Sequence, residues 1–253
     1  MTVAAIVQAR LGSTRLPAKV LLPLPTGRTV IEEVLYRCTR IPGVHVVVAA
    51  IPDTEENNII AGRVEQFQFP HDALGNGSMC VDPGRLGGNL PLRSGLVPMT
   101  VVRGPEHDVL ARYVKAAEAV SADVIMRITS DCPLIDPDTC GAVLSIFRQN
   151  GLDYVSNAWP VREVPHGWDC EVFTRDTLDR AMAGVTAKRA INTEAIEAMI
   201  WAEHVTIWMQ KTEGVKHAIL KDMVDRSHIR WTLDTLADYT AIWNEFKRRE
   251  EAA

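Results

Sequence analysis

The sequence lacks the features that mark membrane-spanning, secreted or nucleic-acid-binding proteins. No segment approaches the roughly 18 consecutive apolar residues of a membrane-spanning helix. The N-terminal run MTVAAIVQAR has neither the basic region nor the longer apolar core of a secretory signal peptide. The net charge of −5 argues against the basic surface of a general nucleic-acid binder. We therefore expect a cytoplasmic protein that binds neither membranes nor nucleic acid.

Cysteines are few, and their spacing fits neither a disulfide framework nor a CxxC metal site. The five are Cys38, Cys80, Cys132, Cys140 and Cys170. We expect reduced and mostly buried thiols. The composition is otherwise that of an ordinary globular protein, with 47% apolar and 23% charged residues. A chain of 253 residues can bury a full core without covalent cross-links.

Short apolar runs alternate with segments of helical spacing along most of the chain. This alternation predicts a mostly parallel mixed sheet between helices, which is an α/β fold in a single domain over residues 1–253. The predicted strands are 3–9, 44–51, 99–102, 123–128, 153–156, 170–173 and 215–220. The predicted helices are 29–41, 54–67, 106–120, 136–146, 175–183, 187–202 and 235–250.

Residues 68–98 interrupt this alternation with a run rich in glycine and proline that has no apolar period. We interpret the run as an irregular insertion in the domain, because strands and helices resume after it. Long loops of this kind are often functional or disordered. A cover for a substrate pocket, a subunit contact and plain disorder all remain open.

Ligands of open α/β sheets bind at the carboxyl ends of the strands, which here selects the loops 9–19, 129–137 and 231–235. The first loop brings Arg10, Arg15 and Lys19 together, with hydroxyl and backbone donors from residues 12–14. Such a loop can hold phosphates through cations and N–H groups. Its spacing is that of neither a Walker A loop nor GxGxxG. A solvated basic loop is the alternative.

The other two loops each carry an aspartate. Asp131 follows an apolar strand, where a carboxylate can hold a magnesium ion on a triphosphate. A helix cap or a turn aspartate is the alternative for Asp131, although Asp136, directly before Pro137, fits the cap role better. Asp234 precedes the last predicted helix, so a cap is again the alternative to a metal ligand.

Several segments resemble one known family. The run AIVQARLGSTRLPAKVL resembles the signature of the cytidylyltransferases that activate sugars, such as the CMP-Kdo and CMP-acylneuraminate synthetases, and in particular the spore-coat polysaccharide biosynthesis protein F subgroup. RITSDCPLIDP and RWTLDT resemble two further family segments, and RGPEHDVLARY, PHGWDCEVF and EHVT resemble weaker ones. Leu11, Ala18 and Ser130 depart from the family pattern, which has Met, Gly and Gly there.

The resemblance implies a single Rossmann-like, GT-A-like nucleotidyltransferase domain. It implies transfer of CMP from CTP to a small acidic acceptor, such as a ulosonic acid, an amino sugar or a phosphonate, with release of pyrophosphate. The implied cofactor is Mg²⁺, with Asp131 and Asp234 as its ligands. Family relatives are often dimers, so a homodimer is compatible with this resemblance.

Individual roles follow from the same resemblance. Arg15, Lys19 and Asp131 are implied as catalytic residues. The nucleotide-binding set is Gln8, Ala9, Arg10, Gly12, Ser13, Thr14, Arg15, Lys19, Arg103, Arg127 and Ser130. The acceptor-binding set is Asp169, Glu171 and His204. Asp169 and Glu171 alternate on a predicted strand, so both should point to one face.

A purely structural role is the alternative at two positions. A lone histidine such as His204 is more often structural than catalytic. Arg112, in the same motif as Arg103, can instead form an ion pair with Asp108 at i,i+4.

Two other functions stay open beside the cytidylyltransferase. A GT-A glycosyltransferase using a nucleotide sugar is one, since related folds host different functions. Its usual Asp-x-Asp motif is missing, because the segment around Asp131 reads SDCP. A non-catalytic nucleotide-binding protein is the other. The presence of both candidate metal carboxylates and all three cations of the first loop argues against it.

Overall fold

The computed structural model describes residues 1–67, 97–192, 196–222 and 224–252. The predicted insertion at 68–98 therefore lies almost wholly outside the described residues, as does Cys80. The other four cysteines are buried and free, as expected. No helix in the described part of the chain is long and apolar enough to cross a membrane.

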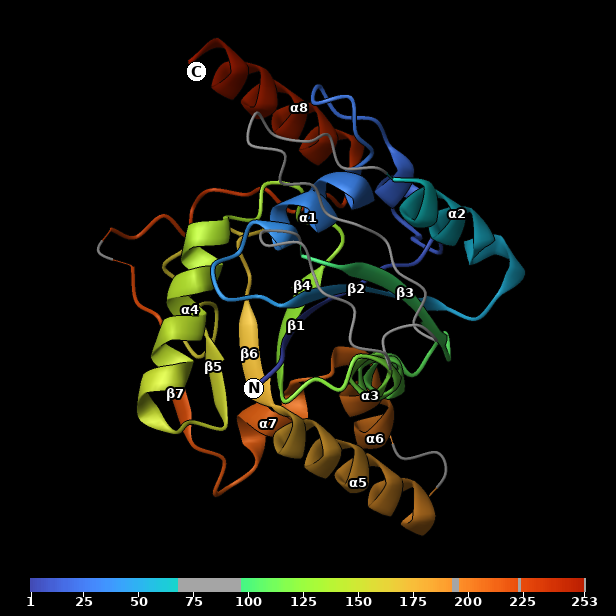
Figure 1. Cartoon of the computed structure of the whole chain (residues 1–253), viewed down its shortest axis with the longest axis vertical. Helices are drawn as coiled ribbons and strands as arrows, with labels where there is room; N and C mark the ends of the chain where they lie inside the picture. Colours follow the sequence, from blue (N-terminus) through green and yellow to red (C-terminus); the bar gives the residue numbers. More distant parts are fainter. Residues whose placement is uncertain (68–96, 193–195, 223, 253) are drawn as a thin grey trace.

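Within the described residues, seven strands form one mixed sheet in the order β3-β2-β1-β4-β6-β5-β7 (Figure 1). Strands β1 to β4 are parallel neighbours, β6 runs antiparallel to β4 and β5, and β7 is parallel to β5. The predicted α/β fold with a mostly parallel sheet is thus confirmed. The strands are β1 Val3–Gln8, β2 Val46–Pro52, β3 Met99–Gly104, β4 Val124–Thr129, β5 Tyr154–Ser156, β6 Glu171–Thr174 and β7 His217–Ile219.

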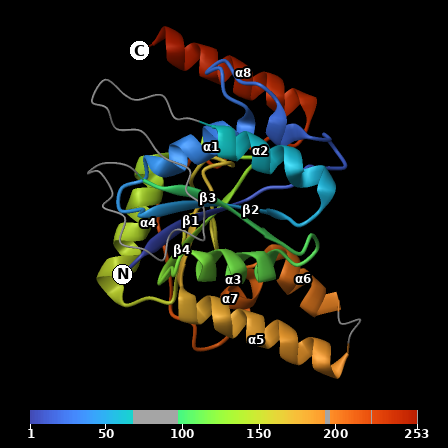
Figure 2. The ribbon, with the colours of Figure 1, turned by 45° about the vertical axis from the view of Figure 1, so that its right-hand side comes forward.

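Helices cover both faces of the sheet (Figure 2). Helices α1 (Val30–Thr39), α2 (Asn58–Gln66) and α4 (Pro137–Asn150) pack against one face, and α3 (Val109–Ala119), α5 (Arg175–Ile191), α6 (Ile196–His204) and α7 (Ile207–Lys211) against the other. Strand β1 is buried from both sides: Val3, Ala5 and Val7 join the first core, and Ala4 and Ile6 join the second. Burial on both faces explains why central strands read as continuous apolar runs.

The last helix, α8 (Leu236–Glu251), lies beside α1 rather than on the sheet (Figure 1). Ile242 and Phe246 of α8 pack in a third apolar cluster with Leu24, Val30 and Leu233. The cluster also contains Leu134, which follows β4. This packing brings the segment before α8 over the ends of β1 and β4, where two of the predicted ligand loops lie.

The predicted break between helices at 183–187 is wrong, because α5 runs without interruption to Ile191. An isolated glycine inside a helical pattern weakens the prediction of a helix from sequence. A Cβ atom on Gly184 would lie 2.4 Å from Nε1 of Trp208, so this glycine instead lets Trp208 of α7 pack against α5. The short helix α7 itself was not predicted.

The loop after β1 contains a residue in the left-handed region of backbone space. Ala18 has φ 55° and ψ 22°, and it directly precedes the short 3-10 turn Lys19–Leu21. An L-residue pays a steric cost in this region that glycine avoids. Ala18 is one of the positions where the resembled family pattern has glycine.

We therefore expect Ala18→Gly to leave the free energy of unfolding unchanged or to raise it by up to about 1 kcal/mol, since it relieves the left-handed strain. The matched control is Ala187→Gly, at an exposed position inside α5, which we expect to lower that free energy by about 1 kcal/mol. Denaturant unfolding of both variants measures the difference. Equal destabilisation by the two substitutions would contradict the conformation of Ala18.

Candidate active site

A pocket of about 310 Å³ opens at the carboxyl ends of β1 and β4. It brings together side chains from all three loops that the strand-end rule selected. Helices α3 and α6 contribute the remaining wall. The lining residues are Gln8, Ala9, Arg10, Gly12, Ser13, Thr14, Arg15, Lys19, Val20, Val109, Arg112, Arg127, Thr129, Ser130, Asp131, Glu203, His204 and Asp234.

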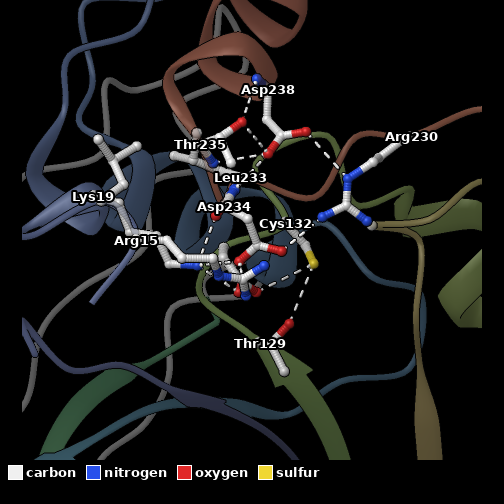
Figure 3. A network of polar contacts seen from close by, with 12 residues as sticks. Arg15, Lys19, Thr129, Cys132, Arg230, Leu233, Asp234, Thr235 and Asp238 are labelled. Atoms are coloured by element: carbon white, nitrogen blue, oxygen red, sulfur yellow. Dashed lines mark hydrogen bonds and ion pairs between the residues drawn. The ribbon is translucent and has the colours of Figure 1, made fainter. Parts of the chain in front are cut away.

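The ammonium group of Lys19 lies at the junction of the three loops (Figure 3). Its Nζ atom donates to Oδ2 of Asp131 at 2.9 Å, to Oδ1 of Asp234 at 3.0 Å and to the backbone carbonyl of Leu233 at 2.6 Å. The Lys19 side chain is only 11% exposed, so these contacts are largely shielded from water. The lysine thus joins two carboxylates that lie more than 100 residues further along the chain.

Burial and charge act in opposite directions on this ion pair. Burial by itself would lower the pKa of the Lys19 ammonium, but the charges and hydrogen bonds of Asp131 and Asp234 outweigh it and raise that pKa. Burial would likewise raise the pKa of Asp131, and the charge of Lys19 lowers it below the ordinary value. Both groups are therefore ionised around neutral pH.

Asp234 is held by two further cations. Its Oδ1 accepts from Arg15 at 2.9 Å, and its Oδ2 accepts from Arg230 at 2.6 Å (Figure 3). The alternative role of Asp234 as a helix cap is wrong, because Thr235 caps α8 and forms a capping box with Asp238. The start of α8 thus leaves the Asp234 side chain free to turn toward Lys19.

Asp131 is also not a helix cap. That role belongs to Asp136, whose carboxylate accepts from the backbone N–H of Thr139 at 2.8 Å at the start of α4, as predicted. The backbone carbonyl of Asp131 accepts from the N–H of Leu233 at 2.8 Å. This bond ties the loop after β4 to the segment that carries Asp234, so the spacing of the two aspartates is fixed by backbone contacts.

The cations of the first loop differ in their surroundings. Arg10 lies at the rim of the pocket, 3.8 Å from a carboxylate oxygen of Glu203. Arg15 has a side chain that is 65% exposed, in contrast to the buried Lys19. The loop is anchored by the buried Asn57, whose side-chain oxygen accepts from the N–H of Leu11 at 3.0 Å. Sequence reasoning missed this anchor, since Asn57 sits in an otherwise ordinary helix start.

Arg127 and Glu171, predicted to contact different substrates, form a pair with each other at 2.5 Å. Glu171 also accepts from the hydroxyl of Tyr154 at 2.5 Å and from the side-chain amide of Gln210 at 3.2 Å. Burial would lower the pKa of Arg127, but the charge of Glu171 raises it. Arg127 lines the pocket, and its buried Nε atom has no partner among the described residues. Glu171 thus pairs with Arg127, which in turn lines the pocket.

The predicted shared face of Asp169 and Glu171 is wrong. Strand β6 begins at Glu171, so Asp169 lies before the strand and outside its alternation. Its carboxylate pairs with Arg162 and accepts from the N–H of Gly167 at 2.9 Å. Of the three predicted acceptor residues, only His204 lines the pocket described above.

Of the two arginines in the RGPEHDVLARY motif, Arg112 and not Arg103 lines the pocket. Arg103 lies on β3 and is not part of the pocket lining. Arg112, which is 2% exposed, lines the pocket and donates to the carbonyl of Glu106 at 3.2 Å. The proposed pair of Arg112 with Asp108 is not the one formed, because Asp108 caps α3 and pairs with Arg189 at 2.6 Å.

The two aspartates could hold a divalent metal ion together. Their Oδ2 and Oδ1 atoms converge on one cation, the ammonium of Lys19. No cluster of three or more His, Cys, Asp or Glu side chains with metal-binding geometry occurs among the described residues. A metal ion here would therefore need oxygens from a substrate and from water, which is the mixed ligand set that Mg²⁺ prefers. The residues present fit such an ion.

Comparison with known proteins gives consistent matches. Residues 4–74 match the model of the family described as cytidylyltransferase. An uncharacterized protein of Methanocaldococcus jannaschii is 29% identical over 242 residues, covering 94% of this chain and 81% of that protein. The spore coat polysaccharide biosynthesis protein SpsF of Bacillus subtilis is 28% identical over 247 residues, covering 94% of this chain and 83% of its own.

Solved structures show the same fold. A cytidylyltransferase from Leptospira borgpetersenii has a TM-score of 0.74 at 24% identity, covering 96% of this chain and 85% of its own. A CMP:2-keto-3-deoxy-manno-octonic acid synthetase complexed with CTP has a TM-score of 0.59 at 16% identity, covering 98% of this chain and 100% of its own. Rv0371c of Mycobacterium tuberculosis, complexed with manganese, has a TM-score of 0.53 at 12% identity, covering 96% of this chain and 99% of its own.

The resemblance that the sequence motifs predicted is therefore confirmed: residues 4–74 match the cytidylyltransferase family model, and almost the whole chain shares the fold of a solved cytidylyltransferase.

Proposed function

We propose that this protein is a Mg²⁺-dependent cytidylyltransferase that transfers CMP from CTP to a small acidic acceptor and releases pyrophosphate. The observation that carries the proposal is the convergence of two carboxylates, the half-buried Asp131 and the buried Asp234, with two loop cations, Lys19 and Arg15, in the lining of one strand-end pocket. The CTP complex of a structural neighbour and the sequence match in residues 4–74 support the choice of nucleotide.

The first loop would bind the triphosphate. Arg10, Arg15 and Lys19 offer positive charge, and residues 12–14 offer backbone and hydroxyl donors at the same wall of the pocket. These groups would stabilise the charge that grows on the leaving pyrophosphate, which is the main task of a protein in phosphoryl-type transfer. Gln8, Ala9, Arg103 and Ser130 stay in the proposed nucleotide set, with Arg103 the one outside the pocket lining.

Asp131 and Asp234 would hold the metal ion. A Mg²⁺ ion held by these two carboxylates would supply Lewis-acid stabilisation of the charge that grows on the phosphates. A manganese complex of a structural neighbour supports a divalent cation in this fold. The acceptor attacks directly, so the proposal needs no covalent intermediate on the protein. That is consistent with a pocket lined by cations and carboxylates, with His204 as its one histidine among the described lining residues.

The acceptor would contact Arg127, which lines the pocket, and Arg162, which lies outside the described lining; this moves Arg127 from the predicted nucleotide set to the acceptor side. Glu171 orients Arg127, and Asp169 orients Arg162. An acidic acceptor is repelled by a free carboxylate but attracted by a guanidinium, which binds carboxylates in bidentate fashion. We therefore keep Asp169, Glu171 and His204 on the acceptor side, with both carboxylates acting through their arginines. We also propose that the chain works as one cytoplasmic nucleotidyltransferase domain, of which 68–98 is an insertion.

A thermal-shift screen tests the choice of nucleotide. The purified protein is heated with CTP, UTP, ATP, GTP or a UDP-sugar, each with and without Mg²⁺. We expect selective stabilisation by CTP with Mg²⁺, because a ligand that binds only the folded state raises the melting temperature. A pyrophosphate-release assay with candidate acids then identifies the acceptor. Stabilisation by a UDP-sugar and by no triphosphate would instead support the glycosyltransferase.

Asp131→Asn removes the charge of one metal ligand while keeping a similar shape. We expect turnover to fall by more than the roughly 10–100-fold that loss of an outer-shell partner costs a metal site. The control is Asp136→Ala, which removes the cap of α4 and should lower stability by about 1 kcal/mol without changing turnover. Steady-state rates and thermal melts of both variants separate the loss of turnover from the loss of stability. Normal turnover in Asp131→Asn would show that the metal assignment is wrong.

Arg15→Ala tests the phosphate-binding role of the first loop. Arg15 is exposed and a charge-assisted hydrogen bond contributes about 1.5–3 kcal/mol, so we expect CTP affinity to fall roughly 10–100-fold with little change in melting temperature. Arg180→Ala, at an arginine of α5 whose side chain is 42% exposed, is the control and should change neither. Calorimetric titration with CTP measures both. Equal CTP affinities for the two variants would exclude Arg15 from the triphosphate site.

A further inference from the structure

Lys19 has no N–H left for a phosphate in this structure. A lysine ammonium carries three N–H donors. Asp131 Oδ2, Asp234 Oδ1 and the carbonyl of Leu233 surround Nζ at 2.6–3.0 Å and take all three. A phosphate oxygen can therefore bond Lys19 only after at least one of these contacts breaks.

The same contacts also occupy one oxygen of each carboxylate that a metal ion would use. The oxygens of Asp131 and Asp234 that face each other across the site both accept from Nζ of Lys19. A metal ion between these oxygens would meet the positive charge of the ammonium at close range. In this arrangement, a divalent cation and the Lys19 ammonium compete for one position.

The carboxylates are held in place without Lys19. Arg230 donates to Oδ2 of Asp234 at 2.6 Å, and its Nε donates to Asp238 in the first turn of α8 at 3.1 Å. The backbone of Asp131 is fixed by its bond to Leu233, and Oδ1 of its carboxylate accepts from Sγ of Cys132 at 3.6 Å. If the lysine left, these contacts would therefore remain, and the exposed Arg15 would be the one other cation on Oδ1 of Asp234 among the described residues.

We propose that Lys19 is a counter-ion that occupies the metal position in the free protein and moves onto the triphosphate when metal and nucleotide bind. The inference rests on the proposed function for its ligands. It makes the nucleotide and the metal ion mutually dependent: each removes the obstacle to the other. The free protein would bind a divalent cation weakly, and a triphosphate and the cation would bind with positive coupling. The flexible stem of lysine suits this movement, whereas a planar arginine fork would not.

Mn²⁺ binding to the nucleotide-free protein tests the proposal without any catalytic readout. Electron paramagnetic resonance titration gives the affinity for Mn²⁺ in the wild type, in Lys19→Met and in Arg15→Met. We expect Lys19→Met to bind Mn²⁺ about tenfold more tightly than the wild type, within the usual range of coupling between sites. Arg15→Met removes a cation from the same carboxylate, but an exposed one, and should change the affinity by less than about threefold.

Several results would overturn the proposal. Unchanged or weaker Mn²⁺ binding in Lys19→Met would show that the lysine does not occupy the metal position. Equal tightening in Arg15→Met would show a general effect of charge and not an exchange by Lys19.

A second measurement covers the case in which Lys19→Met does not fold. The wild-type protein is titrated with Mn²⁺ in the presence and absence of inorganic triphosphate, with the Mn²⁺ bound by free triphosphate measured separately. Exchange predicts that the triphosphate tightens Mn²⁺ binding to the protein at least about fivefold, and that Mn²⁺ tightens triphosphate binding by the same factor. Independent binding of the two ligands would overturn it.

These outcomes are separable from failure of the proposed function. If Lys19→Met tightens Mn²⁺ binding but CTP neither binds nor reacts, the exchange stands and the cytidylyltransferase proposal fails. If CTP supports pyrophosphate release but neither the substitution nor the triphosphate affects Mn²⁺ binding, the enzyme proposal stands and the exchange fails.

Discussion

The contact of the Lys19 ammonium with Asp131 and Asp234 is the interaction on which the rest of the pocket depends. The two carboxylates come from loops separated by about a hundred residues, and both are largely removed from water. Two carboxylates at such short range would repel each other, and desolvation would further favour their neutral forms. The lysine offsets both effects, because its charge lies between them. Its own burial is in turn acceptable only because both acids are present.

The fold brings the three loops that carry Lys19, Asp131 and Asp234 to one place. Parallel strands β1 and β4 are neighbours and end at the same edge, so the loops that follow them emerge side by side. The third loop reaches them from the far end of the chain because α8 packs beside α1 through Ile242 and Phe246. N-caps at Thr235 and Asp136 define the residues at which α8 and α4 begin. Each helix start thereby leaves a neighbouring aspartate free to face the pocket.

The position of Arg127 in the pocket depends on the change of strand direction between β4 and β6. Strand β6 runs antiparallel to β4, which places Glu171 opposite Arg127 in the sheet register. The buried pair is completed by Tyr154 and Gln210, so the arginine is held from behind while its Nε is left without a partner among the described residues. A buried N–H without a partner costs free energy, so this wall of the pocket offers a donor that a ligand can use.

The sequence alone determined the α/β class, most of the strands and helices, and the three loops that form the pocket. Those features follow from local periodicity and from the rule that ligands bind at the carboxyl ends of parallel strands. Only the tertiary structure decided which charges pair: that Lys19 bridges the aspartates, that Glu171 stands behind Arg127, that Arg112 and not Arg103 lines the pocket, and that Gly184 admits Trp208 rather than ending a helix. The reason is physical. Secondary structure depends on neighbours a few residues apart, whereas the partner of a charged side chain depends on strand register and helix packing over the whole chain.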